Sequence, residues 1–540
     1  MIKRDHRPER WLAVALFAAG FVLLFRRWLF SGFDLAFGDD QDGYLIIALV
    51  EHWHRVFTGA ASWADPNFFY PQRGTLGYTD TFFLLGLVHA PLRMLGVDTF
   101  TAFMLVVAAL AAIGFFGFQR LAVRHFGLPP GYAAVGAFLF AFGNVDAVKL
   151  IHVQAYCAMV LPVLFDLFLS GWSGKRRGIL LGATAGALYA ALFLTAFQTA
   201  WFFGCYLLLL ALLYPAVCGV TATRSLAWQM ATSKRPLMLA AACGFAAAIV
   251  PFLYLYLPVL FAGHSREFAE VASNMPQWRD LANVTPENAV WGGILKWLTI
   301  AGRPGRPVWE VELAFTPGVL AVFIAGLVWL AMRARRPLAS ADPYLVVLGM
   351  AAVIFWLLQM DYFGVRPWRA IWAFLPGGGA IRYPFRSQLV ANLFVALVVA
   401  RVLAAMAGRR LLTVMLCGFL VIEQTNLVWP PTVSRRAALA WIDAVPAPPA
   451  PCRAFYVPPS AADGPSAAQL QTAAILFAAI RGIATINGYS TWVPDGWALD
   501  EPASPGYPAA VRDWAHRNGI EAGLCGLELP AGGWMPGLPQ

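Results

Sequence analysis

Three aspartates stand close together near the N-terminus, in a segment rich in acidic and aromatic residues. Asp39, Asp40 and Asp42 lie within four residues, just after a long apolar run. Neighbouring carboxylates raise one another's pKa, which suits a general base, and carboxylate oxygens are also the ligands that divalent cations prefer. The alternative is structural, with the acids capping a helix that begins near Tyr44. The sequence predicts all three as catalytic candidates, with Asp39 and Asp40 as the ligands if Mg²⁺ or Mn²⁺ binds.

A second polar cluster combines arginines with aromatic residues and three consecutive glycines, which let backbone approach a ligand closely. Arginine suits bidentate phosphate recognition, and aromatic rings flank a lipid tail or stack on a sugar. The alternative is an interfacial belt that anchors helix ends. We predict a donor-phosphate site, with Tyr383 as a substrate contact beside it. Its arginines are Arg366, Arg369, Arg382 and Arg386.

A third signal is a short polar hairpin between two apolar runs, which carries Asp146, Lys149, His152 and Gln154. His152 and Gln154 diverge by about 200° on a regular helix, so they face one ligand only where the hairpin is irregular. A histidine satisfied within the protein is the alternative. We predict both residues as substrate contacts.

These residues must be positioned by a membrane scaffold. The chain has 540 residues, of which 59% are hydrophobic and 13% are charged. Its mean hydropathy is +0.63, and apolar runs long enough to cross a bilayer recur along it. The net charge of +10 does not indicate nucleic-acid binding, because Lys and Arg sit in short clusters between apolar runs.

The apolar runs predict about eleven membrane-spanning helices. With the N-terminus in the cytoplasm, all six short cytoplasmic segments are basic, as the positive-inside rule requires. The first run is read as a retained helix, because it ends in Arg26 and Arg27 without a small-residue cleavage site. The predicted spans are 11–30, 98–118, 130–147, 152–171, 178–195, 198–216, 237–262, 314–332, 343–360, 387–407 and 411–428.

The long irregular segments then fall on the opposite, outer side, as loops 31–97, 263–313 and 361–386 and the C-terminal segment. Within the first loop, the apolar stretch from Phe82 to Leu95 is short for a span, so we read it as re-entrant or interfacial. The alternative is a true spanning helix, with another span lost elsewhere.

The chain therefore divides into a transmembrane module, 1–429, and a small extracytoplasmic domain, 430–540, which begins where Pro, Ala and Gly replace Leu and Val. Strand and helix patterns alternate in this domain and predict an α/β fold. Cys452 and Cys525 both lie in it, and an oxidising compartment would allow them to form a disulfide.

Several known motifs are absent: no Walker A sequence, zinc-ligand spacing, G-x-S-x-G or nucleotide-binding G-x-G-x-x-G occurs. No cytoplasmic segment is long enough to bind a nucleotide sugar. Acids and arginines on outer loops instead indicate chemistry at the outer leaflet on a lipid-phosphate substrate.

Several short motifs then suggest a family. The chain resembles the multispanning GT-C glycosyltransferases, specifically bacterial membrane proteins whose first outer loop reads G-D, then aromatic residues, then D/N-x-x-F-Y-P. The matching residues of the first loop are Gly38-Asp39, Trp53 and Asp65 to Pro71. Three later segments also resemble that group, namely His152-x-Gln154, Arg382-x-Pro384-x-Arg386 and Asn487-Gly488-Tyr489-Ser490.

This resemblance implies an inverting transfer of a sugar from a polyprenyl-phosphate donor to an extracytoplasmic glycan, lipid or protein. It implies that Asp39 is the general base, with Asp40 and Asp42 close enough to replace it in that role, and that Tyr70 of the F-Y-P segment contacts substrate. The doubled acid departs from relatives that have one Asp after the Gly. The implied location is the bacterial inner membrane.

Two other functions are weighed against this one. A transporter or flippase for a lipid-linked glycan would also need outward arginines, but it should carry polar residues deep in its helices and inverted repeats. The sequence shows few of the former and no clear sign of the latter. An inactive scaffold whose C-terminal domain recruits a partner is the third reading.

Overall fold

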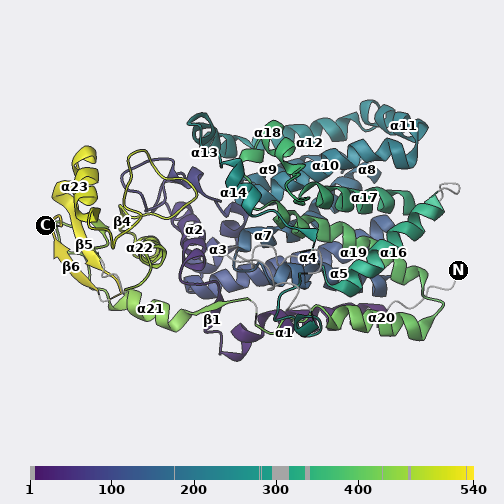
Figure 1. Ribbon diagram of the computed structural model, residues 1–540, viewed down its shortest axis with the longest axis horizontal. Coiled ribbons are helices and arrows are strands. Elements are labelled where there is room, and N and C mark those ends of the chain that lie inside the picture. The colour runs from purple at the N-terminus through teal and green to yellow at the C-terminus, as the bar shows by residue number, and fades with distance from the viewer. Residues whose placement is uncertain are drawn as a thin grey trace.

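The computed structural model describes residues 7–174, 177–278, 280, 283–294, 315–334, 341–428, 430–459, 464–530 and 532–539. Figure 1 shows a large helical bundle and a smaller C-terminal domain, with the two chain ends at opposite ends of the long axis. Some residues used in the topology prediction lie outside the described residues, namely Lys3, Arg4, Lys175, Arg176, Arg335, Arg336 and all of 295–313.

Helices or pairs of helices occupy every predicted span. Within the described residues, six helices are long and apolar enough to cross a membrane, or seven if one bent pair forms a single span. The other predicted spans contain shorter apolar helices. The bundle helices are α1 (Arg7–Phe30), α4 (Thr99–Phe126), α5 (Pro130–Ala141), α8 (Leu161–Ser173), α9 (Gly178–Thr195), α10 (Phe197–Cys218), α12 (Arg235–Ala248), α13 (Val250–Phe261), α16 (Pro317–Ala334), α17 (Asp342–Leu358), α19 (Gln388–Ala405) and α20 (Arg410–Ile422).

The predicted span 237–262 is broken rather than continuous. Its two halves, α12 and α13, are bent by 57° at Ile249. Pro251 explains the break, because proline has no N–H to donate and its ring clashes with the carbonyl four residues earlier. An additional helix, α11 (Val220–Ala231), precedes α12 and has no buried residue.

The centre of the bundle is α19, in which every residue from Gln388 to Ala400 is buried. A helix that is apolar on all sides is one surrounded by protein. It packs against α5, α16 and α17, while the long α4 packs against α5 and α8. Asp98 caps the start of α4, and Gly127 ends it in the left-handed conformation. These helices form the rigid base from which the outer loops emerge.

The first outer loop is itself folded. It contains β1 (Leu35–Phe37), α2 (Asp42–Phe57), a 3₁₀ turn η1 (Thr75–Tyr78) and α3 (Phe83–Met94). Helix α3 coincides with the apolar stretch read as re-entrant or interfacial, and its twelve residues extend roughly 18 Å, too short for a hydrocarbon core of about 30 Å. Arg93 of α3 is paired with the buried Glu51 of α2 at 2.8 Å, which fixes the two helices together.

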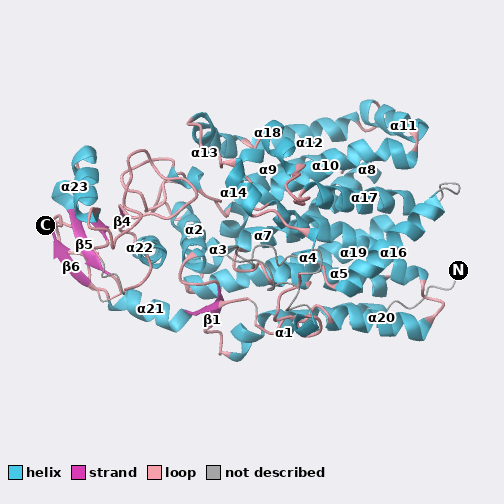
Figure 2. Cartoon of the chain, in the orientation of Figure 1, coloured by secondary structure: helices cyan, strands magenta, loops and turns pink. Residues whose placement is uncertain are grey.

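The C-terminal domain is a small α/β unit, with strands and helices where the sequence pattern predicts them (Figure 2). Its sheet has the order β4-β3-β5-β6, and β3 is parallel to both of its neighbours while β6 is antiparallel to β5. Ser466 and Gln469 form a capping box at the start of α22. The elements are α21 (Arg435–Ala444), β3 (Ala454–Tyr456), α22 (Ala467–Arg481), β4 (Ala484–Thr485), α23 (Tyr507–Asn518), β5 (Leu524–Glu528) and β6 (Gly533–Pro536).

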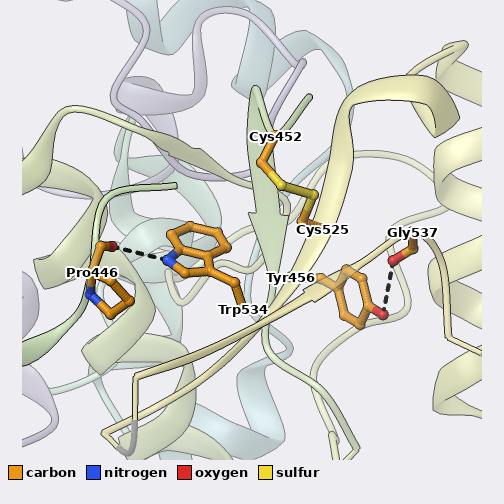
Figure 3. The surroundings of a disulfide bond; sticks show 6 residues. All are labelled: Pro446, Cys452, Tyr456, Cys525, Trp534 and Gly537. Atoms are coloured by element: carbon orange, nitrogen blue, oxygen red, sulfur yellow. Dashed lines mark hydrogen bonds between the residues drawn. A yellow bond between two sulfur atoms is a disulfide. The ribbon is translucent and has the colours of Figure 1, made fainter. Parts of the chain in front are cut away.

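Cys452 and Cys525 are joined by a disulfide, with their Cα atoms 5.6 Å apart (Figure 3). The bond ties the turn before β3 to β5. Nearby, Trp534 of β6 donates a hydrogen bond to the Pro446 carbonyl, and the Tyr456 hydroxyl donates one to the Gly537 carbonyl. The sheet is therefore cross-linked both covalently and by side chains that reach the chain before and after it.

The C-terminal domain is attached to the first outer loop at several places. β1 pairs antiparallel with β2 (Thr432–Ser434) at the start of the domain, and α2 packs against α22, between the domain and the bundle (Figure 1). The segment around Phe69 pairs with the chain after β4, where Phe69 N–H donates to the Asn487 carbonyl and Tyr70 N–H to the Thr485 carbonyl, each at 3.0 Å. The first outer loop and the domain thus form one folded unit.

Candidate functional site

Asp39 lies in a tight turn between β1 and α2. Gly38 has φ +121°, and a Cβ atom on it would lie 2.8 Å from the Gly43 Cα, so only glycine fits. The Oδ1 atom of Asp39 accepts hydrogen bonds from the N–H groups of Gln41 (3.1 Å) and Gly43 (2.9 Å). One carboxylate oxygen therefore caps α2, while Oδ2 has no hydrogen-bond donor among the residues that the structure describes.

The two neighbouring aspartates point to different partners. Asp40 is exposed, and its Oδ2 accepts a hydrogen bond from Gln469 of α22 at 2.7 Å, so it joins the first outer loop to the C-terminal domain. Asp42 is the first residue of α2, and its Oδ2 lies 3.5 Å from His152 Nδ1. The three adjacent acids therefore have three different partners. Asp39 caps α2 and keeps one oxygen spare, Asp40 contacts the C-terminal domain, and Asp42 contacts His152.

Tyr489 brings the acids and one arginine together. Burial raises the pKa of its hydroxyl, and the charges of Asp42 and Asp39 raise it further, whereas Arg382 lowers it. These groups must therefore lie close enough to Tyr489 for their charges to act on it. The sequence analysis gave Tyr489 no role, although it lies in the Asn487-Gly488-Tyr489-Ser490 motif.

The rest of that motif is structural. Asn487 is fully buried and accepts a hydrogen bond from the Val457 N–H, while Gly488 lies against the Phe69 ring, where a Cβ would come within 2.0 Å. Tyr70, predicted as a substrate contact, also lies at this junction, and its carbonyl accepts a hydrogen bond from Trp514 at 2.9 Å. Its role with substrate stays a prediction.

Arg382 and Arg386 both lie close to the Tyr383 ring. Their guanidinium carbons are 5.0 and 4.6 Å from its ring centroid. Arg382 is partly exposed and paired with Glu270 of the second outer loop at 2.8 Å, whereas Arg386 is 8% exposed. These two arginines and Tyr383 form a positively charged wall, of which Arg382 and Tyr383 act on the Tyr489 hydroxyl.

The other two predicted arginines are held elsewhere on the third outer loop. Arg366 is paired with Asp361, at 3.1 Å, in a turn after α17. Arg369 is exposed on α18 (Trp368–Phe374) and lies 5.6 Å from the Phe268 ring centroid. Their assignment to the donor phosphate also stays a prediction. Phe268 belongs to the same short helix as Glu270, α14 (Phe268–Ser273), so Arg369 approaches the cluster from its outer edge.

The polar hairpin is irregular. A turn replaces the helix before His152, and a four-residue helix α7 (Val153–Tyr156) follows it. His152 contacts Asp42, whereas Gln154 lines a cavity together with Asp80, Thr199 and Arg386. The His152 side chain therefore points to Asp42 and the Gln154 side chain to a neighbouring cavity, so the two do not face one common ligand position.

Asp80 is the acid that the sequence analysis missed. It accepts a hydrogen bond from the Phe197 N–H at 2.9 Å, and burial raises the pKa of its carboxyl to about 6 despite the opposing effects of that bond and of Arg386. It follows Tyr78 and Thr79 with no distinctive spacing, so only tertiary contacts identify it. Glu270, also missed, lies in the long second loop without a recognisable motif.

No group of three or more His, Cys, Asp or Glu side chains is arranged to hold a metal ion in the described part of the chain. Asp39 and Asp40 direct their hydrogen-bonding oxygens to the α2 backbone and to Gln469 respectively. The residues do not form a ready cation site, and a divalent cation stays a prediction.

No family model matches this chain, and no curated protein matches its sequence. Solved structures do resemble it. The mycobacterial arabinofuranosyltransferase AftD aligns with a TM-score of 0.50 at 17% identity, over 94% of this chain and 33% of AftD. An oligosaccharyltransferase from Archaeoglobus fulgidus aligns at 0.46 and 13% identity, over 88% of this chain and 62% of its own. ArnT from Cupriavidus metallidurans aligns with a TM-score of 0.36 at 15% identity, over 88% of this chain and 89% of ArnT.

The likeness to AftD extends along nearly the whole chain, although this chain spans only about a third of AftD. It confirms the predicted fold, a mostly helical, multi-pass membrane protein with a small α/β domain. Because AftD is far larger, its activity does not transfer with the fold.

Proposed function

We propose that this protein is a glycosyltransferase that moves a sugar from a polyprenyl-phosphate donor to an extracytoplasmic acceptor with inversion. Two observations support the proposal: the fold shared with an arabinofuranosyltransferase, and a site that combines a carboxylate with a phosphate-compatible wall. The observation that carries it is the arrangement at Tyr489, where Asp39 with its spare oxygen and Arg382 act on the same hydroxyl.

The reaction needs a base and a means of stabilising the leaving group. Asp39 Oδ2 accepts the proton of the acceptor hydroxyl or amine, while the acceptor atom bonds to the anomeric carbon and the bond from that carbon to the phosphate oxygen breaks. The electron pair leaves with the polyprenyl phosphate. Arg382 and Arg386 stabilise its growing negative charge through directed N–H groups.

The remaining residues position these two groups. The hydrogen bonds from Gln41 and Gly43 fix the Asp39 carboxylate, so that Oδ2 keeps one direction. His152 holds Asp42 at the start of α2, and Glu270 holds Arg382. Tyr489 lies among the acids and the arginine, where its hydroxyl contacts substrate from the side of the C-terminal domain.

In the proposed orientation the N-terminus is cytoplasmic and the C-terminal domain lies outside the inner membrane. The basic short loops support it. The disulfide of the C-terminal domain also fits an oxidising compartment.

The test is sugar transfer by the purified protein in lipid vesicles, from a panel of polyprenyl phosphates carrying a pentose or a hexose, with and without EDTA. Transfer from at least one donor, with a product of inverted configuration, supports the proposal, and loss of transfer in EDTA would assign a cation. Movement of a lipid-linked glycan between leaflets without transfer from any donor would instead identify a transporter.

A further inference from the structure

One carboxylate oxygen joins two arginines from different outer loops. Oε1 of Glu270 lies 2.7 Å from an Nη atom of Arg266 and 2.8 Å from Arg382 Nε. Arg266 belongs to the second outer loop, just before α14, and Arg382 belongs to the third. A single negative charge thus holds together two guanidinium groups that repel each other. The proposed transfer uses Arg382 and gives no role to Arg266.

Arg266 lies where three parts of the outer region meet. Its side chain is 15% exposed, and its backbone N–H donates to the Gly379 carbonyl of the third loop at 2.9 Å. Its guanidinium carbon lies 5.7 Å from the ring centroid of Trp492, which follows Tyr489 by three residues in the C-terminal domain. Arg266 is therefore fixed beside the proposed site by the third loop and by the domain.

Both arginines have a buried N–H donor without an acceptor. Arg266 Nε and Arg382 Nε donate no hydrogen bond to any residue that the structure describes. Arg382 Nε is close to Glu270 Oε1, but the contact lacks hydrogen-bond geometry, so it is an ion pair only. Another such donor, Trp372 Nε1, is nearby, because a Cβ on Gly379 would lie 3.8 Å from it. Buried donors without acceptors are costly, so they indicate that an anion or water accepts from them.

Glu270 is able to withdraw from the arginines while its backbone stays in place. Its side chain is 34% exposed, and that of Arg382 is 44% exposed. The Glu270 carbonyl accepts hydrogen bonds from Ser273 Oγ at 2.7 Å and Asn274 Nδ2 at 2.9 Å, which do not involve its side chain. Partly exposed ion pairs contribute little to stability, so an incoming anion replaces the Glu270 carboxylate at small cost.

The charges select the class of ligand. Glu270 supplies one negative charge to two cations, so these three residues keep a net positive charge and favour an anion with several accepting oxygens. A sugar phosphodiester carries one negative charge, whereas the phosphate monoester left after transfer carries nearly two at neutral pH. Two arginines without Glu270 between them therefore match the phosphate best as the sugar leaves.

We propose that Glu270 takes the place of the phosphate in the ligand-free protein, and that the lipid phosphate displaces it to bind Arg266 together with Arg382. Arg266 is then a further phosphate-binding residue. Glu270 keeps the two arginines together before the lipid binds, and it competes with the product lipid and so aids its release. The inference rests on the proposed function and adds to it a competing group within the same site.

The experiment measures binding of polyprenyl phosphate and of neutral polyprenol to the full-length protein in nanodiscs, with inorganic phosphate as a soluble competitor. The variants are Glu270→Gln, which keeps the side-chain size and removes the charge, and Arg266→Gln. Glu267→Gln is the matched control for the acid, because Glu267 is exposed and directly precedes the same short helix. Arg512→Gln, an exposed arginine on α23, is the control for the arginine.

In the wild type, polyprenyl phosphate should bind roughly tenfold or more tightly than polyprenol. Glu270→Gln should strengthen the binding of polyprenyl phosphate roughly threefold to tenfold beyond any gain in Glu267→Gln, because the competing carboxylate is gone. Arg266→Gln should weaken it at least about fivefold, and Arg512→Gln should leave it unchanged. Misfolding cannot produce the gain in affinity, so Glu270→Gln is the decisive variant.

Weaker binding in Glu270→Gln, or a gain no larger than in Glu267→Gln, would overturn the proposal, since Glu270 would then only support Arg382. Wild-type affinity in Arg266→Gln would overturn the role of Arg266. Displacement of the lipid by an equimolar amount of inorganic phosphate would overturn the assignment to a lipid phosphate. Equal binding of polyprenyl phosphate and polyprenol by the wild type would instead refute the proposed function.

Discussion

Two groups of carboxylates differ in how many of their oxygens are occupied. At the end of α20, Glu423 is fully buried and accepts hydrogen bonds from four donors: Trp291 Nε1, Thr316 Oγ1 and the N–H groups of Gly318 and Val319. In the first outer loop, Asp39 and Asp80 each use a single oxygen, for backbone N–H groups. Both oxygens of Glu423 are thus satisfied by the protein itself, whereas Asp39 and Asp80 each keep an oxygen that a ligand is able to use.

The difference shows that burial does not by itself mark a functional acid. Glu423 is more buried than Asp39, yet its hydrogen bonds only hold the start of α16 and Trp291 of the second outer loop against the end of α20. Asp166 is likewise paired with Arg120 at 2.8 Å and His125 at 2.9 Å, between α8 and α4. Asp39 and Asp80, which each keep a spare oxygen, lie near Arg382 and Arg386 respectively.

Glu423→Ala gives the largest expected loss of stability. Removing the carboxylate leaves four donors without an acceptor, and we expect a loss of at least about 4 kcal/mol in unfolding free energy. Denaturant titration of the purified variant in detergent measures it, with Asp443→Asn as the control. A variant as stable as the wild type would show that the four hydrogen bonds to Glu423 do not stabilise the fold.

Arg386→Ala extends the comparison from carboxylates to arginines, because Arg386 and Arg366 also differ in their partners. We expect kcat/KM for sugar transfer to fall roughly a hundredfold or more, because a buried donor to the leaving phosphate is lost. The matched control is Arg366→Ala, since Arg366 is already paired with Asp361. Initial rates of sugar transfer by both variants test this prediction. Equal losses of kcat/KM in the two variants would contradict the assignment of Arg386, and not Arg366, to the leaving phosphate.

Removing the disulfide tests whether the C-terminal domain must be cross-linked to support the first outer loop. The bond closes a sequence separation of 73 residues, so Cys452→Ser with Cys525→Ser should destabilise the domain by about 2–4 kcal/mol. Limited proteolysis of the domain reports the loss. Unchanged protease resistance would show that packing of α2 on α22 suffices.

Asp80→Asn should raise stability, the opposite of Glu423→Ala. The folded protein holds the Asp80 proton up to a pKa of about 6, against 3.8 for the ordinary carboxyl, so wild-type stability falls as pH rises from about 4 to 6. At pH 8 the variant should gain no more than about 3 kcal/mol, and below pH 4 almost nothing. Thermal midpoints at the two pH values measure this, and a pH-independent difference would contradict it.

Sequence reasoning found what depends on local pattern. Apolar runs identify α4 and α10 because a bilayer imposes a length on each helix. Gly38 with Asp39 was found through a short family motif, and the structure adds the reason for the glycine, since the turn leaves no room for a Cβ. Even the capping role weighed for the acids is present, since Asp39 caps α2 with one oxygen. Those features are encoded within a few residues of one another.

What it missed depends on contacts between distant segments. Asp80 acquires its character from Phe197 and Arg386, and Tyr489 from acids 450 residues earlier in the chain. The bend between α12 and α13 was missed for another reason, since Pro251 is visible in the sequence but the apolar run continues through it. Hydropathy does not register a backbone break.

The most direct test of the account compares two adjacent acids. Asp39 has a spare oxygen and lies beside Tyr489, whereas Asp40 is exposed and bonded to Gln469. We expect Asp39→Asn to lower the initial rate of sugar transfer at least about a hundredfold while the protein stays folded, and Asp40→Asn to lower it less than about tenfold. A wild-type rate in Asp39→Asn, or the larger loss in Asp40→Asn, would contradict the assignment of the base.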